Sequence, residues 1–274
     1  MNATRITHAP ASRPARAAHL PDRPDALNWT LPRLRPGEPF PPAHQALPAA
    51  APYPGLLAAG GSVDAPTLRA AYSAGIFPWF GEDEPPLWWS PDPRMVLLPQ
   101  ELRVRRSLRQ AARRMSQDPS LDLRVDTAFG AVMRACAAPR AGVEGTWIGP
   151  AILRAYGELH AQGLAHSFEL WRDGELVAGL YLVALGAAAC GESMFTRVDD
   201  GSKLLLMALC GFALARGLWF IDCQQQTAHL ASLGARPWPR ARFLRELEQA
   251  RQLQGPPSWQ YDWTQFRQHC AAWL

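Results

Sequence analysis

Two polar residues follow a run of apolar ones, at the point where a buried strand would end. Residues 218–221 read Leu-Trp-Phe-Ile, Asp222 comes directly after them, and Gln224 lies two positions further on. The carboxyl ends of strands are the usual place for ligand sites in open sheets, and residues two apart in an extended chain face the same side. We therefore predict that both side chains serve a catalytic or binding site at one edge of a sheet. An aspartate in a purely structural hydrogen bond is the alternative.

A second carboxylate lies in a stretch that is otherwise apolar or small. Glu192 follows Gly191, and the flanking residues are Ala187–Cys190 on one side and Met194 and Phe195 on the other. Burial of a carboxylate costs free energy unless the group is paired or half exposed. We therefore expect a cationic partner for Glu192, either in a substrate or in a structural salt bridge.

Arginine is concentrated between residues 103 and 140. Nine arginines and three aspartates give this stretch a net charge of +6, more than the +4 of the whole chain. Apolar residues at helical spacing (Val104, Leu108, Ala111 and Met115) predict a helix that carries its arginines mostly on the opposite face. Such a face suits nucleic-acid phosphates, although most charged helix faces are simply solvated.

Composition excludes several classes of protein. The chain has 274 residues, 48% of them hydrophobic and 19% charged, which is enough for one large domain or two modest ones. No apolar run reaches the length of a membrane span, and the N-terminus lacks the apolar region of a secretory signal. The five cysteines are scattered without C-x-x-C spacing, so we expect no zinc site or disulfide framework and a reduced, cytoplasmic setting.

The elements that must position these residues divide the chain into four parts. Residues 1–54 hold 12 of the 26 prolines, so we expect a poorly ordered extension. Residues 55–99 form a small N-terminal domain, with a helix at 65–74 capped by Asp64 and a loop-rich aromatic surface at 76–93. Residues 100–254 alternate between strands and helices, including a hairpin at Asp173-Gly174, and residues 255–274 are a tail of open role. This alternation predicts an α+β fold (an α/β-type mixed sheet).

Five stretches, in this order and spacing, resemble the leucyl/phenylalanyl-tRNA–protein transferase family. They are Gly75-Ile-Phe-Pro-Trp-Phe80, Trp88-Trp-Ser-Pro-Asp-Pro-Arg94, Glu144-Gly-Thr-Trp-Ile148, Cys190-Gly-Glu-Ser-Met-Phe195, and Ile221-Asp-Cys-Gln224 followed by His229-Leu-Ala-Ser-Leu-Gly-Ala235. The resemblance extends from about residue 53 to 247. It implies a small domain followed by an acetyltransferase-like (GNAT-type) catalytic domain. It also implies transfer of leucine or phenylalanine, with methionine a further candidate, from aminoacyl-tRNA to the N-terminal arginine or lysine of a protein marked for degradation.

The resemblance places Asp222, Gln224 and Glu192 in the reaction. An amide is a very weak base, but an α-amino group has a pKa of about 7.7–8.0, so about a tenth of it is neutral near pH 7. We therefore expect Gln224 to act as an orienting acceptor for the attacking amine and Asp222 to be its electrostatic support. Glu192 would face either the amino group of the donor or the cationic side chain of the acceptor, and the sequence leaves both open.

Other residues are candidates for substrate binding. Arg113 and Arg114 fall where the family holds the tRNA acceptor stem, and Arg106 and Arg109 share their helix. A pocket for the leucyl or phenylalanyl side chain would be lined by Trp79, Trp147, Leu180, Met194 and Phe195, for which ordinary core packing is the alternative. Leu180 stands in Gly179-Leu-Tyr181 where family members can carry methionine, so donor preference could be retuned.

Two other functions compete with this interpretation. An acetyl-CoA-dependent N-acetyltransferase would need a glycine-rich turn for the pyrophosphate, whereas residues 196–202 read Thr-Arg-Val-Asp-Asp-Gly-Ser, with two acids. A non-catalytic tRNA-binding protein would explain the arginines but would give Asp222, Gln224 and Glu192 no purpose. For the transferase we expect no metal or organic cofactor, no membrane contact, and a monomer.

Overall fold

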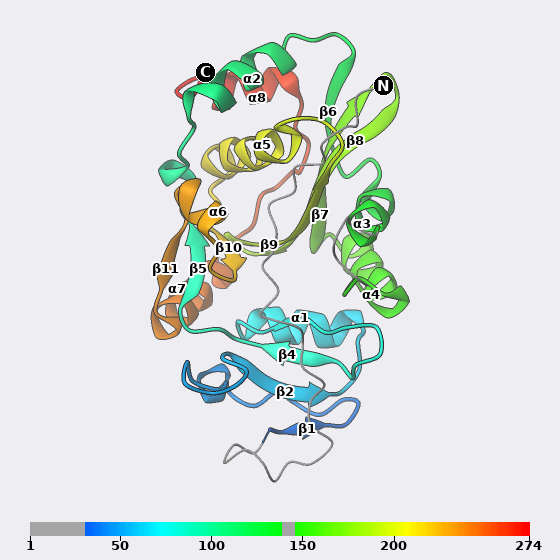
Figure 1. Ribbon diagram of the computed structural model, residues 1–274, viewed down its shortest axis with the longest axis vertical. Coiled ribbons are helices and arrows are strands. Elements are labelled where there is room, and N and C mark those ends of the chain that lie inside the picture. Colours follow the sequence, from blue (N-terminus) through cyan, green and yellow to red (C-terminus); the bar gives the residue numbers. More distant parts are fainter. Residues whose placement is uncertain (1–30, 139–145) are drawn as a thin grey trace.

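The structure, a computed structural model, describes residues 31–138 and 146–274, and its strands form two sheets (Figure 1). The smaller sheet has the order β1-β2-β4-β3, with β1 Arg33–Leu34, β2 Leu56–Gly60, β4 Leu87–Trp89 and β3 Phe77–Pro78. The larger sheet has the order β11-β5-β10-β9-β8-β7-β6. Its strands are β11 Arg236–Trp238, β5 Arg94–Leu97, β10 Phe220–Gln224, β9 Ala188–Thr196, β8 Glu175–Leu185, β7 Ala165–Arg172 and β6 Leu121–Val125.

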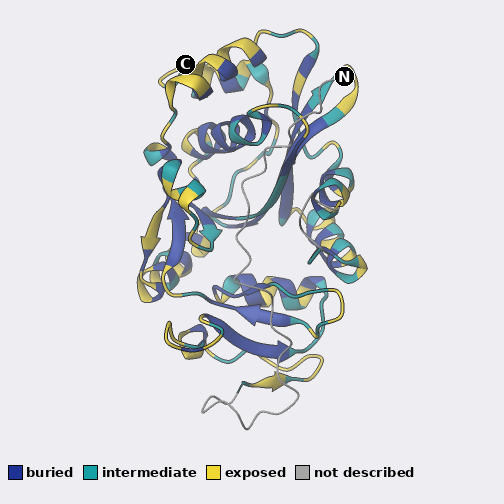
Figure 2. Ribbon diagram, in the orientation of Figure 1, coloured by how far each residue is buried: buried dark blue, intermediate teal, exposed yellow. Residues whose placement is uncertain are grey.

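Helices cover both faces of the larger sheet. On one face α5 (Gly201–Arg216) packs beneath α2 (Arg106–Met115) and α8 (Trp263–His269); on the other lie α3 (Phe129–Ala137), α4 (Pro150–Ala161) and α7 (Arg240–Gln252). Figure 2 shows that α5 is buried, whereas α2 is exposed on its outer side. The helix of the smaller part, α1 (Ala65–Ser73), contacts α4 and α7. The α+β class with a mixed sheet is therefore confirmed.

Local signals in the sequence predict several of these elements correctly. The carboxylate of Asp64 accepts a hydrogen bond from the backbone N–H of Thr67 at 2.8 Å, which caps α1 as expected. Asp173 and Gly174 have φ values of 49° and 84° and join β7 to β8 in the expected hairpin. No helix in the described part of the chain is long and apolar enough to cross a bilayer.

The two parallel strands in the middle of the larger sheet separate at their carboxyl ends. β10 pairs with β9 from Phe220↔Ala188 to Asp222↔Cys190, and within the described residues the ladder ends there. β9 continues beside β8 as far as Thr196, so residues 191–194 have a strand neighbour on one side and are partly exposed. The separation leaves a place at this edge of the sheet where side chains of β9 and β10 can meet a substrate.

The proline-rich segment corrects one expectation of the sequence. Residues 31–54, expected to be poorly ordered, belong to the smaller part: β1 pairs in parallel with β2, and Ala43, Ala46 and Ala51 are buried. Prolines are compatible with such packing at the edge of a sheet, where an N–H donor is not needed. The expectation for residues 1–30 lies outside the described residues.

Two further expectations change with the structure, and the tail, whose role was left open, is placed. Trp88 is fully buried and donates to the carbonyl of Gly60 at 2.8 Å, so residues 76–93 are not an aromatic surface. β5 pairs with β10 and β11 in the larger sheet, so we propose the domain boundary between residues 89 and 94 rather than at 100. The tail packs on the larger domain: Phe266 of α8 is fully buried, and the indole of Trp263 donates to the carbonyl of Leu121.

Replacement of Phe266 by alanine tests the contribution of the tail. The change removes a fully buried aromatic side chain next to α5, so we expect the free energy of unfolding to fall by about 3–5 kcal/mol. Gln268→Ala, an exposed position on the same helix, should change it by less than about 0.5 kcal/mol. Urea unfolding of both variants measures the difference, and equal losses would contradict this packing of the tail.

Candidate active site

Asp222 lies in a buried ion pair that sequence reasoning missed. Its two carboxylate oxygens accept from Nε of Arg94 at 2.8 Å and from an Nη of Arg94 at 2.7 Å, and the side chains are 0% and 1% exposed. The guanidinium lies over the rings of Phe77 and Phe243, at 4.7 and 4.6 Å from their centroids. Cation–π contacts of this kind, together with the bidentate geometry, offset the cost of taking both charges out of water.

The same carboxylate fixes the backbone of Gln224. Oδ1 of Asp222 accepts from the backbone N–H of Gln224 at 2.9 Å. Gln224 has a left-handed φ of 62°, and the pairing of β10 with β5 is irregular between these two residues. Asp222 therefore supports Gln224 through its main chain. The electrostatic support that the sequence suggested for the glutamine side chain stays a prediction.

The side chain of Gln224 is held by Glu192. Nε2 of Gln224 donates to Oε1 of Glu192 at 2.7 Å, and the hydroxyl of Tyr156 donates to Oε2 at 3.1 Å. No described residue donates to the carbonyl oxygen of the Gln224 amide, so this oxygen is available to accept a hydrogen bond from a ligand. Burial raises the pKa of Glu192 to about 8, against the opposing effect of the tyrosine hydroxyls, which stabilise the carboxylate.

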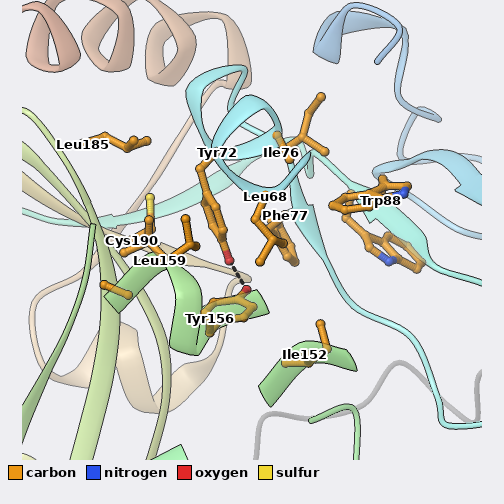
Figure 3. Packing of buried hydrophobic residues seen from close by; sticks show 14 of the residues in the cluster. Leu68, Tyr72, Ile76, Phe77, Trp88, Ile152, Tyr156, Leu159, Leu185 and Cys190 are labelled. Carbon is orange, nitrogen blue, oxygen red and sulfur yellow. Dashed lines mark hydrogen bonds between the residues drawn. The ribbon is translucent and has the colours of Figure 1, made fainter. Parts of the chain in front are cut away.

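Tyr72 extends this network into the smaller part of the molecule. The hydroxyls of Tyr72 on α1 and Tyr156 on α4 form a hydrogen bond, drawn as a dashed line in Figure 3. Burial, followed by the nearby charge of Glu192, raises the pKa of both tyrosines well above its ordinary value. Both hydroxyls therefore keep their protons, and Tyr156 can donate to the carboxylate.

The structure does not bring the five predicted pocket residues to one face. Trp79, Trp147 and Phe195 pack with the core on the side of Glu192, and Trp79 contacts the ring of Trp89 at 5.7 Å. Leu180 and Met194 oppose each other in register on the α5 side of the sheet. Adjacent residues of a strand point to opposite faces, which separates Met194 from Phe195.

The basic face of α2 has the geometry that its spacing predicts. Arg106, Arg109, Arg113 and Arg114 are exposed, while Leu108, Ala111, Ala112 and Met115 are buried. Nε of Arg109 donates to the carbonyl of Trp273 at 2.9 Å. In the described ranges none of these four arginines pairs with an acidic side chain, so the face is free to meet anionic ligands.

Comparison with known proteins identifies the family. The family model described as leucyl/phenylalanyl-tRNA protein transferase matches residues 96–248, and the model of its N-terminal domain matches residues 61–92. The chain belongs to this family. The leucyl/phenylalanyl-tRNA–protein transferase of Albidiferax ferrireducens is 53% identical over 85% of this chain and 91% of its own length. That of Bordetella petrii is 53% identical over 84% and 91%.

Solved structures give weaker similarities to this transferase. A GCN5-related N-acetyltransferase from Kribbella flavida is 13% identical, covers 62% of this chain and 59% of its own, and has a TM-score of 0.28. L-PGS from Bacillus licheniformis is 12% identical, covers 61% and 55%, and has a TM-score of 0.36. The family assignment therefore depends on the sequence matches, which confirm the resemblance of the five motifs.

The residues that sequence reasoning missed in the transferase are Arg94, Tyr72 and Tyr156. Arg94 ends the second of the five motifs, so its importance was signalled, but its partner Asp222 is 128 positions away. Tyr72 and Tyr156 lie on the buried faces of amphipathic helices, where tyrosine is ordinary core. The one feature that could have indicated their role is the tyrosine hydroxyl, which requires a hydrogen-bond partner when the ring is buried.

Removal of the Arg94 guanidinium should destabilise the transferase strongly. Arg94→Ala leaves the Asp222 carboxylate buried without a counter-charge, so we expect a loss of about 3–5 kcal/mol in the free energy of unfolding. Arg251→Ala breaks an exposed ion pair with Glu248 and should cost less than about 1 kcal/mol. Denaturant unfolding measures both, and similar values for the two variants would contradict the anchoring role of Arg94.

The raised pKa of Glu192 predicts a pH dependence of stability. Below about pH 4.5 the Glu192 carboxyl is protonated in the folded and in the unfolded protein. As pH rises towards 8, this carboxyl ionises first in the unfolded chain, so the free energy of unfolding falls. Glu192→Gln removes this loss. Between pH 5 and pH 9 the free energy of unfolding of the variant should rise by more than about 1 kcal/mol relative to that of wild type, since one pKa unit corresponds to about 1.4 kcal/mol. Parallel stability curves would show that Glu192 titrates normally.

Proposed function

We propose that the protein transfers leucine or phenylalanine from aminoacyl-tRNA to the N-terminal arginine or lysine of an acceptor protein. The reaction is ester aminolysis. The acceptor nitrogen forms a bond with the aminoacyl carbonyl carbon, the ester C–O bond breaks, and the proton lost by the amine ends on the 3′-oxygen of the released tRNA. Because the ester is already activated, no nucleotide hydrolysis and no cofactor are required. Methionine is a further candidate donor.

The observation that carries the proposal is the orientation of the Gln224 amide. Its nitrogen is engaged by Glu192, so its oxygen is the atom available to the attacking amine. Its backbone is fixed by Asp222, which is itself fixed by Arg94. An acceptor held in this way directs the lone pair of an already neutral amine at the ester, and positioning of that kind can supply much of the barrier reduction without a strong base.

Glu192 is suited to the cationic side chain of the acceptor. One hydrogen bond joins Glu192 to Gln224, so the α-amine at Gln224 and a side chain at Glu192 can come from one residue. A guanidinium or ammonium group beside the carboxylate would favour its charged form and would offset the burial that raises its pKa. An acceptor beginning with alanine leaves this carboxyl without a counter-charge, which gives a physical reason for selection of arginine or lysine.

The donor is held by two other regions in this proposal. Trp79 and Trp147, both partly buried on the side of Glu192, contact the leucyl or phenylalanyl side chain. Arg106, Arg109, Arg113 and Arg114 contact phosphates of the acceptor stem, which gives affinity that depends on salt and carries little sequence information. The reaction takes place in the cytoplasm with a monomeric enzyme, and the tagged acceptor is destined for degradation.

Labelled leucine on its tRNA tests the reaction and the acceptor rule together. Wild-type protein should label a peptide that begins with arginine and leave one that begins with alanine unlabelled. Gln224→Ala should lower kcat/KM for the arginine peptide by about 100-fold, the effect expected for loss of a positioned catalytic group. Gln226→Ala, an exposed glutamine two positions further on, is the matched control and should retain wild-type activity.

Other results of this assay would reject the proposal. Labelling of both peptides alike would contradict the role of Glu192 in acceptor choice. Absence of label on either, with tRNA still bound in a salt-sensitive manner, would favour a tRNA-binding protein without transfer activity. Acetylation of the arginine peptide with acetyl-CoA as donor would favour the acetyltransferase.

A further inference from the structure

A small basic pocket lies outside the polar cluster of Asp222, Gln224 and Glu192. It has a volume of about 210 Å³ and lies between the segment that leads into α2, the start of α5, and the short helix α6 (Ala228–Ser232). Its lining is mainly polar and cationic, comprising Arg103, Arg105, Lys203, His229, Ser107 and Ser232, with Leu108 and Leu233 as apolar members.

A close contact between two segments of the chain defines one side of this basic pocket. The backbone N–H of Arg103 donates to the carbonyl of Leu233 at 2.8 Å, which joins the segment before α2 to the end of α6. Gly234 follows with a φ of 109°, and a Cβ at this position would lie 2.1 Å from the carbonyl oxygen of Glu101. Only glycine allows these two segments to approach so closely.

The charges around the basic pocket are poorly compensated. Arg103, Arg105 and Lys203 are basic side chains, and Asp200, which pairs with Lys203 at 2.7 Å, is the one acid that forms an ion pair with them in the described part of the chain. Burial and, after it, the charge of Lys203 lower the pKa of His229. A volume of 210 Å³ is several times the roughly 30 Å³ that one water occupies in the liquid, so the pocket has room for a small anionic group.

The position of the basic pocket connects two parts of the proposed donor site. His229 lies five residues after Gln224, so their Cα atoms are at most roughly 18 Å apart. Lys203 lies in the first turn of α5, shortly after β9, and Arg105 immediately precedes the basic helix α2. Figure 1 shows α6 beside the carboxyl end of β10, on the side of the sheet that carries α5 and α2.

We propose that the basic pocket binds a backbone phosphate of the single-stranded 3′ end of aminoacyl-tRNA. The inference rests on the proposed function, because that function places the 3′ ester at Gln224 and the acceptor stem on α2. Arg103 and Arg105, which lead into α2, line one pocket with Lys203 and with His229, five residues after Gln224. Arginine suits this role because its planar donors match the geometry of phosphate oxygens. The contact positions the strand and does not select its sequence.

Binding of deacylated leucine tRNA tests the basic pocket without any need for transfer. The affinity is measured for intact tRNA and for the same tRNA trimmed of its unpaired 3′ nucleotides, at several salt concentrations. The variants are Arg105→Ala, an exposed side chain without an acidic partner in the described ranges, and Lys203→Ala. Arg245→Ala is the control: it removes one exposed cation from α7, where its guanidinium donates to a carbonyl of its own helix.

Wild type and the Arg245 control should lose affinity when the tRNA is trimmed. The two pocket variants should bind intact tRNA about five- to tenfold more weakly and lose less on trimming. The slope of log affinity against log salt should fall by about 0.7 for each phosphate that a variant no longer binds. An equal loss on trimming in all four proteins would overturn the proposal. Failure of aminoacyl transfer, in contrast, would reject the proposed function and leave this binding result to be judged by itself.

Discussion

The buried ion pair between Arg94 and Asp222 holds together parts of the chain that are far apart in sequence. Arg94 begins β5, directly after the segment that connects the two sheets, and donates to the carbonyl of Gly75 as well as to Asp222 of β10. Its guanidinium lies between a ring of the smaller sheet, Phe77, and a ring of α7, Phe243. Separation of β5 from β10 would leave a charge in the protein interior without its partner, which is far more costly than the loss of an exposed pair.

The reactive part of the candidate site is built outward from this pair. Oδ1 of Asp222, which accepts from Nε of Arg94, also accepts from the backbone N–H of Gln224, whose left-handed conformation is unfavourable for a residue with a side chain. Gln224 then meets Glu192, and Glu192 meets Tyr156, so each group is oriented by the one before it. Such a site needs little reorganisation when substrate binds, and burial raises the pKa of its Glu192 to about 8.

The sequence predicts best what depends on neighbouring residues. The cap of α1, the hairpin at Asp173 and the buried face of α2 follow from local rules, and the run before Asp222 correctly predicts a strand end. The alternation of side chains along a strand separates Met194 from Phe195, which therefore cannot line the same pocket. Asp222 and Gln224 meet through the irregular end of β10 and not through this alternation. The proline content of residues 31–54 predicts poor order, whereas their small buried alanines decide their packing.

What the sequence could not predict is pairing over long distances. Asp222 and Arg94 meet because β5 and β10 are neighbours in the sheet, which no spacing in the chain encodes. The left-handed turn at Gln224 depends in the same way on a carboxylate whose position is set by that pairing. The five motifs indicated which segments matter, and the fold was needed to show which atoms within them touch.

Lysine is nearly absent from this chain, and its single representative, Lys203, lines the basic pocket. The side chains therefore present one primary amine to any acylating agent, which limits self-modification in an enzyme whose chemistry is the acylation of amines. It also makes the molecule easy to label at one defined position besides its N-terminus. A reporter attached there by ordinary amine chemistry would sit in the first turn of α5, the helix that follows β9 in the chain.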